Sequence, residues 1–349
     1  MSKGQLSKGE LSKDEMSGSG RPLVARLHAR LADGAFHSGE ALAGSLGVSR
    51  SAVWKAAGAL RELGVTLDAV PNRGYRMRPP CEPLDAAAIE RALDAAARGR
   101  VARLDVEWSV GSTNAELLAR PSPRPGTTEV LLAEHQSAGR GRRGRSWLAA
   151  PGGSLCLSMS WLFVEAPRDL GSLSLAIGVA ARRALAGVGA RDVQLKWPND
   201  LLVAERKLGG ILIELRAEAG GPAYVVVGIG VNCALGTGIA ADLAAAGAEP
   251  ADLAAAGADA VSRNVVAAAL VSSIAAMLVE FERAGAAAFL DEWQQADALC
   301  GSPVTVHTFD GERHGIARGI DADGALRVET AAGIERFVSG EVTLRAVRG

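Results

Sequence analysis

The 349-residue sequence contains few cysteines and few aromatic residues. Its four cysteines form no CxxC pair, which excludes a zinc ribbon and a dense disulfide framework. No run of about 18 uncharged apolar residues occurs, and no apolar N-terminal segment precedes a small-residue cleavage site. We therefore expect reduced thiols, a cytoplasmic location and no membrane partner.

No strong charge of either sign marks the chain as a whole, because its formal net charge is −1. A hydrophobic content of 48% allows a buried core and excludes wholesale disorder, and the length predicts two or three domains. The charge is unevenly distributed, since residues 21–80 carry nine Lys or Arg against four Asp or Glu. This basic segment predicts an anion-binding module joined to a different kind of domain.

The first 80 residues divide into an arm and a patterned domain. Residues 1–20 have no sizeable apolar face, so we expect a disordered arm. Within residues 21–80, apolar spacing and capping residues predict three helices, the third of them capped by Ser49, and then a β-hairpin with its tip at residues 71–74. This order predicts a winged helix-turn-helix DNA-binding domain. A small helical docking or dimerisation domain is the alternative.

The positions of the basic side chains favour DNA binding over docking. Six of them fall on the third helix or the hairpin, where a duplex would lie, and they could neutralise backbone phosphates. The candidate DNA-contacting residues are Ser49, Arg50, Ser51, Lys55 and Arg73.

Two further patterns follow Pro79 and Pro80, which end the basic domain. Residues 84–298 alternate helical and strand-like segments, which predicts an α/β (α+β) domain with a mixed sheet. The expected helices there cover residues 85–97, 172–186, 261–284 and 286–297, and residues 193–203 are strand-like. Residues 301–349 contain only short strands and Gly/Asp turns, which predicts a small SH3-like β-barrel.

A loop rich in glycine and arginine follows Gln136. Its glycines at 139, 141 and 144 match G-x-G-x-x-G, but four arginines surround them and a strand follows instead of a helix. A dinucleotide-binding βαβ unit is therefore excluded. The loop suits a polyanion such as a triphosphate or an acyl-adenylate, and a second nucleic-acid patch is an equal alternative on this segment alone.

A second group of polar residues favours an enzyme. Lys196, Asn199 and Asp200 lie in KWPND, Lys207 lies in RKLGG, and GIGVN ends at Asn232. Lysines and an Asn-Asp pair at strand ends, beside glycines that permit close approach, suit an enzyme that handles a carboxylate and a phosphate.

Five motifs in this order resemble the signatures of the biotin–protein ligases. They are GSTNAE (111–116), EHQSAGRGRRGRSW (134–147), LKWPNDLL (195–202), RKLGGILIEL (206–215) and GIGVN (228–232). The winged helix resembles the bacterial bifunctional subclass, which also represses the biotin operon, and a C-terminal barrel ending in SGEVTLR fits that subclass.

The resemblance implies a two-step reaction of a biotin–[acetyl-CoA-carboxylase] ligase. Biotin and ATP, with Mg²⁺, give biotinyl-5′-AMP, and the biotinyl group then passes to one lysine of the biotin carboxyl carrier protein of acetyl-CoA carboxylase. Operator DNA and a homodimer formed on adenylate binding are the other implied partners.

The resemblance also implies the site residues. Arg142, Lys196 and Lys207 are the expected catalytic residues. Biotin and adenylate contacts are expected from Ser112, Thr113, Asn114, Gln136, Gly139, Arg140, Gly141, Arg142, Arg145, Trp147, Lys196, Asn199, Asp200, Lys207, Gly210, Gly228 and Asn232. Asp200 could orient or deprotonate the incoming amine, and a purely structural role in its turn is equally compatible. No protein metal site is expected.

Three other functions compete with this interpretation. The first is a transcription factor whose central domain only senses a ligand, and the second is a ligase for lipoate or octanoate. The third is a biotin ligase whose winged helix is a docking module. Both lysines and the whole arginine loop argue against the sensor, which has no need to hold pyrophosphate.

Overall fold

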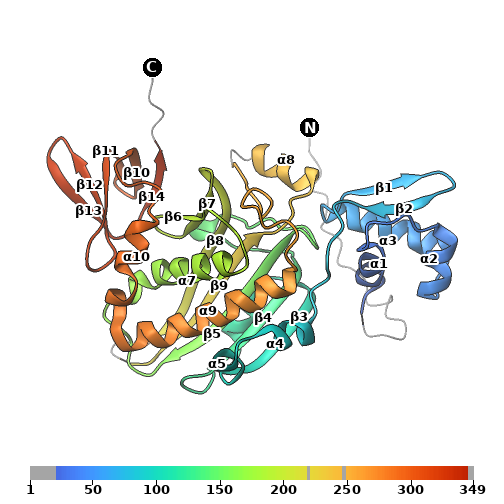
Figure 1. Cartoon of the computed structure of the whole chain (residues 1–349), viewed down its shortest axis with the longest axis horizontal. Coiled ribbons are helices and arrows are strands. Elements are labelled where there is room, and N and C mark those ends of the chain that lie inside the picture. The colour runs from blue at the N-terminus through green and yellow to red at the C-terminus, as the bar shows by residue number, and fades with distance from the viewer. Residues whose placement is uncertain (1–20, 218–220, 246–248, 345–349) are drawn as a thin grey trace, which may run out of the picture. The chain divides into compact units, whose positions relative to one another are not determined.

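The computed structural model describes residues 21–217, 221–245 and 249–344 (Figure 1). The arm expected at residues 1–20 lies outside these ranges. The chain divides into two compact units, Met1–Pro80 and Cys81–Gly349.

The described part of the first unit contains three helices and a two-stranded hairpin. Their bounds are α1 (Leu23–Leu31), α2 (Gly39–Leu46), α3 (Arg50–Glu62), β1 (Leu67–Val70) and β2 (Gly74–Met77). The Ser38 and Ser49 hydroxyls accept hydrogen bonds from first-turn amides and cap α2 and α3. Gly47, with φ of 68°, allows the sharp turn between these two helices, and Asn72, with φ of 62°, lies in the hairpin turn. The predicted helix-turn-helix with a wing is confirmed.

The second unit is built on a mixed sheet whose described strands follow the order β3-β4-β5-β9-β8-β7-β6. Its strands are β3 (Val101–Val110), β4 (Thr128–Gln136), β5 (Ser154–Phe163), β6 (Gln194–Lys196), β7 (Asp200–Val203), β8 (Arg206–Ala217) and β9 (Ala223–Asn232). β3 and β4 are parallel, and the other neighbouring strands are antiparallel. The predicted mixed sheet is thereby confirmed.

Two long helices, α7 (Leu173–Gly187) and α9 (Arg263–Ala284), cover one face of this sheet (Figure 1). The core between these layers includes a row of buried aromatic rings, from Trp161 and Phe163 on β5 to Phe281 and Phe289. The helical segment 263–288, which includes α9, is long and apolar enough to cross a membrane. However, 61% of its most apolar 18-residue stretch is buried inside the protein. We interpret α9 as a core helix because it packs on α7 and β5.

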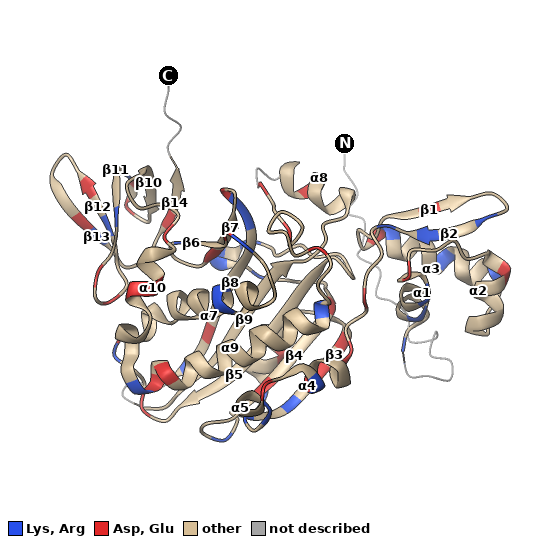
Figure 2. Cartoon of the chain, viewed as in Figure 1, with Lys and Arg blue, Asp and Glu red and all other residues tan. Residues whose placement is uncertain are grey.

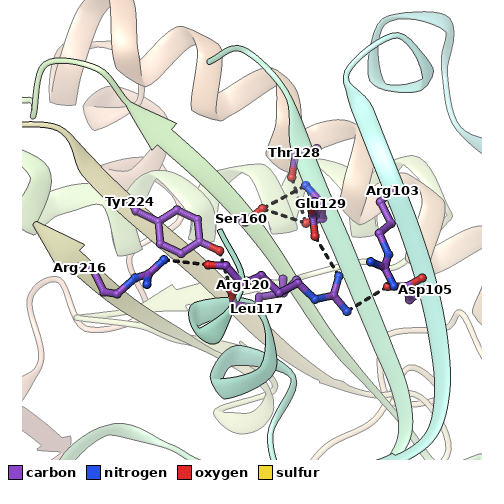
Figure 3. Close-up of polar contacts among 9 residues, drawn as sticks. All are labelled: Arg103, Asp105, Leu117, Arg120, Thr128, Glu129, Ser160, Arg216 and Tyr224. Carbon is purple, nitrogen blue, oxygen red and sulfur yellow. Dashed lines mark hydrogen bonds and ion pairs between the residues drawn. The ribbon is translucent and has the colours of Figure 1, made fainter. Parts of the chain in front are cut away.

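A short helix, α6 (Thr113–Ala119), lies on the opposite face of the sheet. The end of α6 is held by polar contacts (Figure 3): Arg120 forms ion pairs with Asp105 at 3.0 Å and with Glu129 at 2.9 Å. The Tyr224 hydroxyl donates a hydrogen bond to the Leu117 carbonyl at 2.6 Å. These contacts fix the helix whose first residues line the candidate site.

Three expected elements are divided in the structure. The helix expected at 85–97 consists of α4 (Ala86–Ala92) and α5 (Ala95–Arg98), because the Asp94 carboxylate between them caps α5. Residues 193–203 turn back at Pro198 and form β6 and β7. The helix expected at 286–297 is a short 3-10 turn, η4 (Gly285–Ala288), followed by α10 (Leu290–Gln295). A further helix, α8 (Thr237–Ala245), follows β9.

The end of the chain is an antiparallel sheet with the described strand order β13-β12-β11-β10-β14. Its strands are β10 (Pro303–Thr308), β11 (Gly311–Ile320), β12 (Leu326–Thr330), β13 (Gly333–Phe337) and β14 (Glu341–Leu344). The expected all-β structure is confirmed there. The Trp197 indole donates a hydrogen bond to the Gly324 carbonyl at 3.1 Å, which ties the β6–β7 turn to this sheet.

Candidate active site

A cleft in the second unit is lined by residues from the start of α6, the loop after β4, the β6–β7 turn, strands β8 and β9, and the start of β14. Fifteen of the expected site residues line it: Ser112, Thr113, Asn114, Gln136, Arg140, Gly141, Arg142, Arg145, Trp147, Lys196, Asn199, Asp200, Lys207, Gly210 and Gly228. Segments separated by more than 100 residues in sequence are therefore brought together in one cleft.

The polar part of the cleft is a hydrogen-bonded network at the start of α6. The Gln136 side-chain oxygen accepts hydrogen bonds from the Thr113 amide at 2.8 Å and hydroxyl at 3.1 Å. The Ser158 hydroxyl lies 2.7 Å from the Thr113 hydroxyl and 2.6 Å from Asn114 Oδ1. Because these groups hold one another, their remaining donors and acceptors have fixed directions for a polar ligand.

Two glycines of β9 are required by close contacts at the wall of the cleft. A Cβ atom at Gly228 would lie 2.3 Å from Asn114 Oδ1. At Gly230 it would lie 2.4 Å from two ring carbons of Trp147. The indole of Trp147 therefore packs closely against Gly230 of β9, and any larger residue at either glycine would displace a cleft-lining side chain.

Lys196, Lys207 and Arg142 are three of the six basic residues that line the cleft. Lys207 Nζ lies 2.7 Å from Asp200 Oδ1 and 6.0 Å from the centre of the Trp147 ring. Burial lowers the pKa of Lys196; Lys207 and Arg145 lower it further, and Asp200 opposes them. Burial also lowers the pKa of Arg142. A partly desolvated cluster of like charges is well suited to binding an anion, which relieves the repulsion.

Each of the four arginines in the arginine loop contacts a different partner. Arg140 pairs with Glu214 at 3.1 Å, and Arg142 donates a hydrogen bond to Asn199 Oδ1 at 3.3 Å. Arg145 forms an ion pair with Glu341 of β14, and Arg143, whose φ is 55°, donates to the His307 carbonyl of β10 at 3.2 Å. The C-terminal sheet therefore contacts two of the loop's four arginines.

Two expected ligand-binding residues do not line the cleft. The Asn232 amide donates hydrogen bonds to the carbonyls of Lys207 and Ala251, so it joins β8 and β9 to the following segment. At Gly139 a Cβ would lie 2.5 Å from the Trp147 carbonyl, and the glycine permits that close approach of the two ends of the loop. We expected Asn232 and Gly139 to contact the ligand directly. Their positions indicate instead that they support the shape of the cleft.

Sequence reasoning missed several cleft residues. They are Arg143, Ser146, Cys156, Leu157, Trp197, Pro198, Ile211, Leu212, Ile229, Gly230, Gly340, Glu341 and Val342. Arg143, Trp197 and Gly230 lie inside the motifs quoted above, and Glu341 lies in SGEVTLR, so motif membership was an available signal. Cys156 and Leu157 of β5 lie outside every quoted motif and carry no such signal, because they match any buried strand.

Among the residues that the structure describes, no three His, Cys, Asp or Glu side chains lie close enough together to hold a metal ion. Asp200 and Glu341 are carboxylates on the lining, and both already pair with a basic side chain. A divalent cation would therefore enter with a phosphate ligand rather than bind alone.

Figure 2 marks the basic residues of the first unit in blue along its ribbon, and several of their side chains already form ion pairs or hydrogen bonds within the unit. Arg76 and Arg78 both form ion pairs with Asp68, at 2.6 Å and 2.8 Å, and Arg61 donates to the Leu67 carbonyl. The five expected DNA-contacting residues, Ser49, Arg50, Ser51, Lys55 and Arg73, are all exposed. Arg73 stacks 4.0 Å over the Phe36 ring, which orients it on the wing.

These features match one class of protein. The chain belongs to the Biotin/lipoate A/B protein ligase family, whose sequence model matches residues 109–232. Models of the Biotin protein ligase C terminal domain and of an HTH domain match residues 299–345 and 26–76.

The relatives share nearly the whole length of the chain. It is 41% identical to the bifunctional ligase/repressor BirA of Salmonella typhimurium, over 90% of this chain and 95% of that protein. It is 40% identical to the same protein of Escherichia coli, over 92% and 97%. A biotin protein ligase from Aquifex aeolicus, solved with biotin and ATP, is 27% identical with a TM-score of 0.58, over 70% of this chain and 99% of that one.

Proposed function

We propose that this chain activates biotin with ATP to biotinyl-5′-AMP and transfers the biotinyl group to a lysine of the biotin carboxyl carrier protein of acetyl-CoA carboxylase. The observation that carries the proposal is the convergence of Lys196, Lys207 and Arg142 on one cleft beside the fixed polar network. Relatives named ligase/repressor over nearly the full length support it.

In the first step a biotin carboxylate oxygen attacks the α-phosphorus of ATP, and the bond to pyrophosphate breaks. Negative charge then increases on the phosphate oxygens, where Lys207 and Arg142 supply fixed cations that need no reorganisation. The network of Thr113, Asn114 and Gln136 orients biotin, with Ser112, the cap of α6, beside it. Positioning and charge compensation suffice, and no enzyme nucleophile takes part.

In the second step the carrier's lysine amine attacks the acyl carbonyl, the carbon–oxygen bond to phosphate breaks, AMP leaves, and the proton released by the amine passes to solvent. Lys207 and Lys196 stabilise the leaving phosphate. Asp200 pairs with Lys207 at 2.7 Å, and we therefore assign it the orientation of Lys207 in preference to proton abstraction from the amine.

The remaining expected contacts belong to the nucleotide end of the cleft. Arg140, Gly141 and Arg145 form a loop over the adenylate, Trp147 packs over the ligand, and Gly210 permits close approach. Asn199 orients Arg142 at 3.3 Å. Mg²⁺ would enter bound to the ATP phosphates and neutralise part of their charge.

The winged helix over residues 21–80 would bind the operator of biotin-synthesis genes, with residues 84–298 as the ligase domain and 301–349 as the C-terminal domain. A helix-turn-helix repressor usually reads two half-sites, so a homodimer formed with bound adenylate fits this role, in the cytoplasm. The exposed Arg50, Lys55 and Arg73 support the DNA contact.

A direct assay tests the ligase proposal. The full chain is incubated with MgATP, a purified carrier domain and biotin, lipoate or octanoate in parallel, and mass spectrometry follows the carrier. We expect a mass gain of one biotinyl group, only with biotin, and none with Lys207→Met. A mass gain with lipoate or octanoate alone would support a ligase for that acid. No mass gain with any of the three acids would support a transcription factor whose central domain only senses a ligand.

A gel shift tests the repressor role separately. DNA from upstream of the chain's own biotin-synthesis genes should be bound more tightly with biotin and MgATP than without them. Biotinylation without any DNA binding would support the docking module.

A further inference from the structure

Helix α3 of the first unit has two chemically distinct faces. Its buried face is formed by Val53, Ala56, Ala57 and Leu60, which pack against the rest of the unit. The opposite face is formed by Ser51, Trp54, Lys55 and Gly58, at the same helical spacing. Trp54 is 66% exposed and thus contributes little to the core.

The surroundings of Trp54 leave its indole accessible. Gly58 lies one turn further along the same face, and a Cβ atom there would meet nothing within 4 Å. Packing therefore does not require glycine at this position, although glycine is among the weakest helix formers. A Cβ atom at position 58 would not reach the indole either, so the accessibility of Trp54 is given by its own 66% exposure.

The positive charge around the exposed face of α3 indicates what kind of partner Trp54 contacts. Arg50 and Lys55 are exposed on α3, and Arg73 is exposed on the wing. The one acidic residue of α3, Glu62, stands at the last position of the helix, two turns from Trp54. An exposed aromatic side chain flanked by cations on the second helix of a helix-turn-helix fits double-stranded DNA.

We infer that Trp54 reads the operator by packing its indole against thymine C5-methyl groups in the major groove, an inference that rests on the proposed DNA-binding function. The thymine methyl is the apolar group that base pairs present there, so an indole can recognise it by burial alone. Lys55 and Arg50 would hold the helix through phosphates, which carry no sequence information. Trp54 is therefore a specificity-determining residue for thymine.

Replacement of thymine by uracil removes only the methyl group and tests this directly. The full-length protein, with biotin and MgATP, first selects duplexes from random-sequence DNA. The selected duplex is then synthesised with thymine or with uracil, and the two Kd values are compared. We expect uracil to weaken wild-type binding about fourfold for each methyl group that is buried.

Two variants test whether the preference for thymine comes from the Trp54 indole. Trp54→Ala should bind the thymine and uracil duplexes equally, while its biotinylation of the carrier stays at the wild-type rate. The matched control is Val70→Ala, another exposed apolar residue of the same unit, located on β1. It should keep the wild-type preference for thymine.

Four results would overturn the inference. They are equal binding of both duplexes by the wild type, an undiminished preference in Trp54→Ala, selected sites without thymine, and a loss of self-association in Trp54→Ala with unchanged DNA preference. If the wild type selects no DNA, the repressor function fails together with this inference, whereas DNA binding that ignores the methyl groups refutes the role of Trp54 alone.

Discussion

Gly230→Ala tests the packing of Trp147 against β9. The added Cβ would lie 2.4 Å from two ring carbons of Trp147, whereas carbon atoms normally approach to about 3.5–4.0 Å. The ring must therefore move by roughly 1 Å or more. The loop cannot move with it freely, because the Trp147 amide donates a hydrogen bond to the Gly139 carbonyl at 2.9 Å.

The consequence should appear in adenylate formation. A displacement of about 1 Å in a positioning group can cost up to ~100-fold in rate, so we expect kcat/KM for biotin to fall by roughly 30- to 100-fold. Pyrophosphate release at varied biotin concentration measures it. The unfolding midpoint should change little, because Gly230 faces the cleft and not the core. Gly171→Ala is the matched control, since a Cβ there meets nothing within 4 Å.

A double variant separates this clash from other effects of the alanine. In a Trp147→Ala background the ring is gone, so the further change of Gly230 to alanine should reduce kcat/KM by a factor near one. The two substitutions would then be strongly non-additive. An equal penalty in both backgrounds, or near-normal activity of Gly230→Ala alone, would refute the reasoning.

Two further predictions concern charge, and a third concerns the loop at residues 139–147. Arg142→Met and Lys207→Met should each slow pyrophosphate release about 100- to 1000-fold, because each removes a charge-assisted contact made to the transition state; near-normal rates would be incompatible with the proposed site. Arg263→Met should lower the free energy of unfolding in urea by about 3–5 kcal/mol, because it removes the guanidinium group that lies 3.0 Å from the buried Glu134 carboxylate, whose hydrogen bonds from the Leu84 and Gly152 amides remain; a loss below about 1 kcal/mol would contradict this. A non-hydrolysable adenylate analogue should slow hydrogen exchange across residues 139–147 and strengthen dimerisation in sedimentation, since by linkage the dimer must then bind the adenylate more tightly; unchanged protection and association would exclude a ligand-ordered loop.

The local structure of the first unit followed from short-range rules. Ser38 and Ser49 cap helices, and Asn72 and Gly74 allow a tight turn, because each acts on backbone groups only a few residues away. Short-range rules failed where a single side chain interrupted a pattern, as at Asp94, which ends one helix and caps the next.

From the sequence by itself, the order of the motifs was the one signal that indicated which residues form the cleft. The clustered lysines and arginines indicated the type of chemistry. Tertiary structure decided which of these residues meet. Asn232 belongs to a matched motif, yet its amide holds the strand ends together. Glu341 lies 196 residues from Arg145 in sequence, and the pair forms because the loop after β4 lies against the start of β14. Contacts of this kind depend on how distant elements pack, and local residue patterns carry no record of that packing.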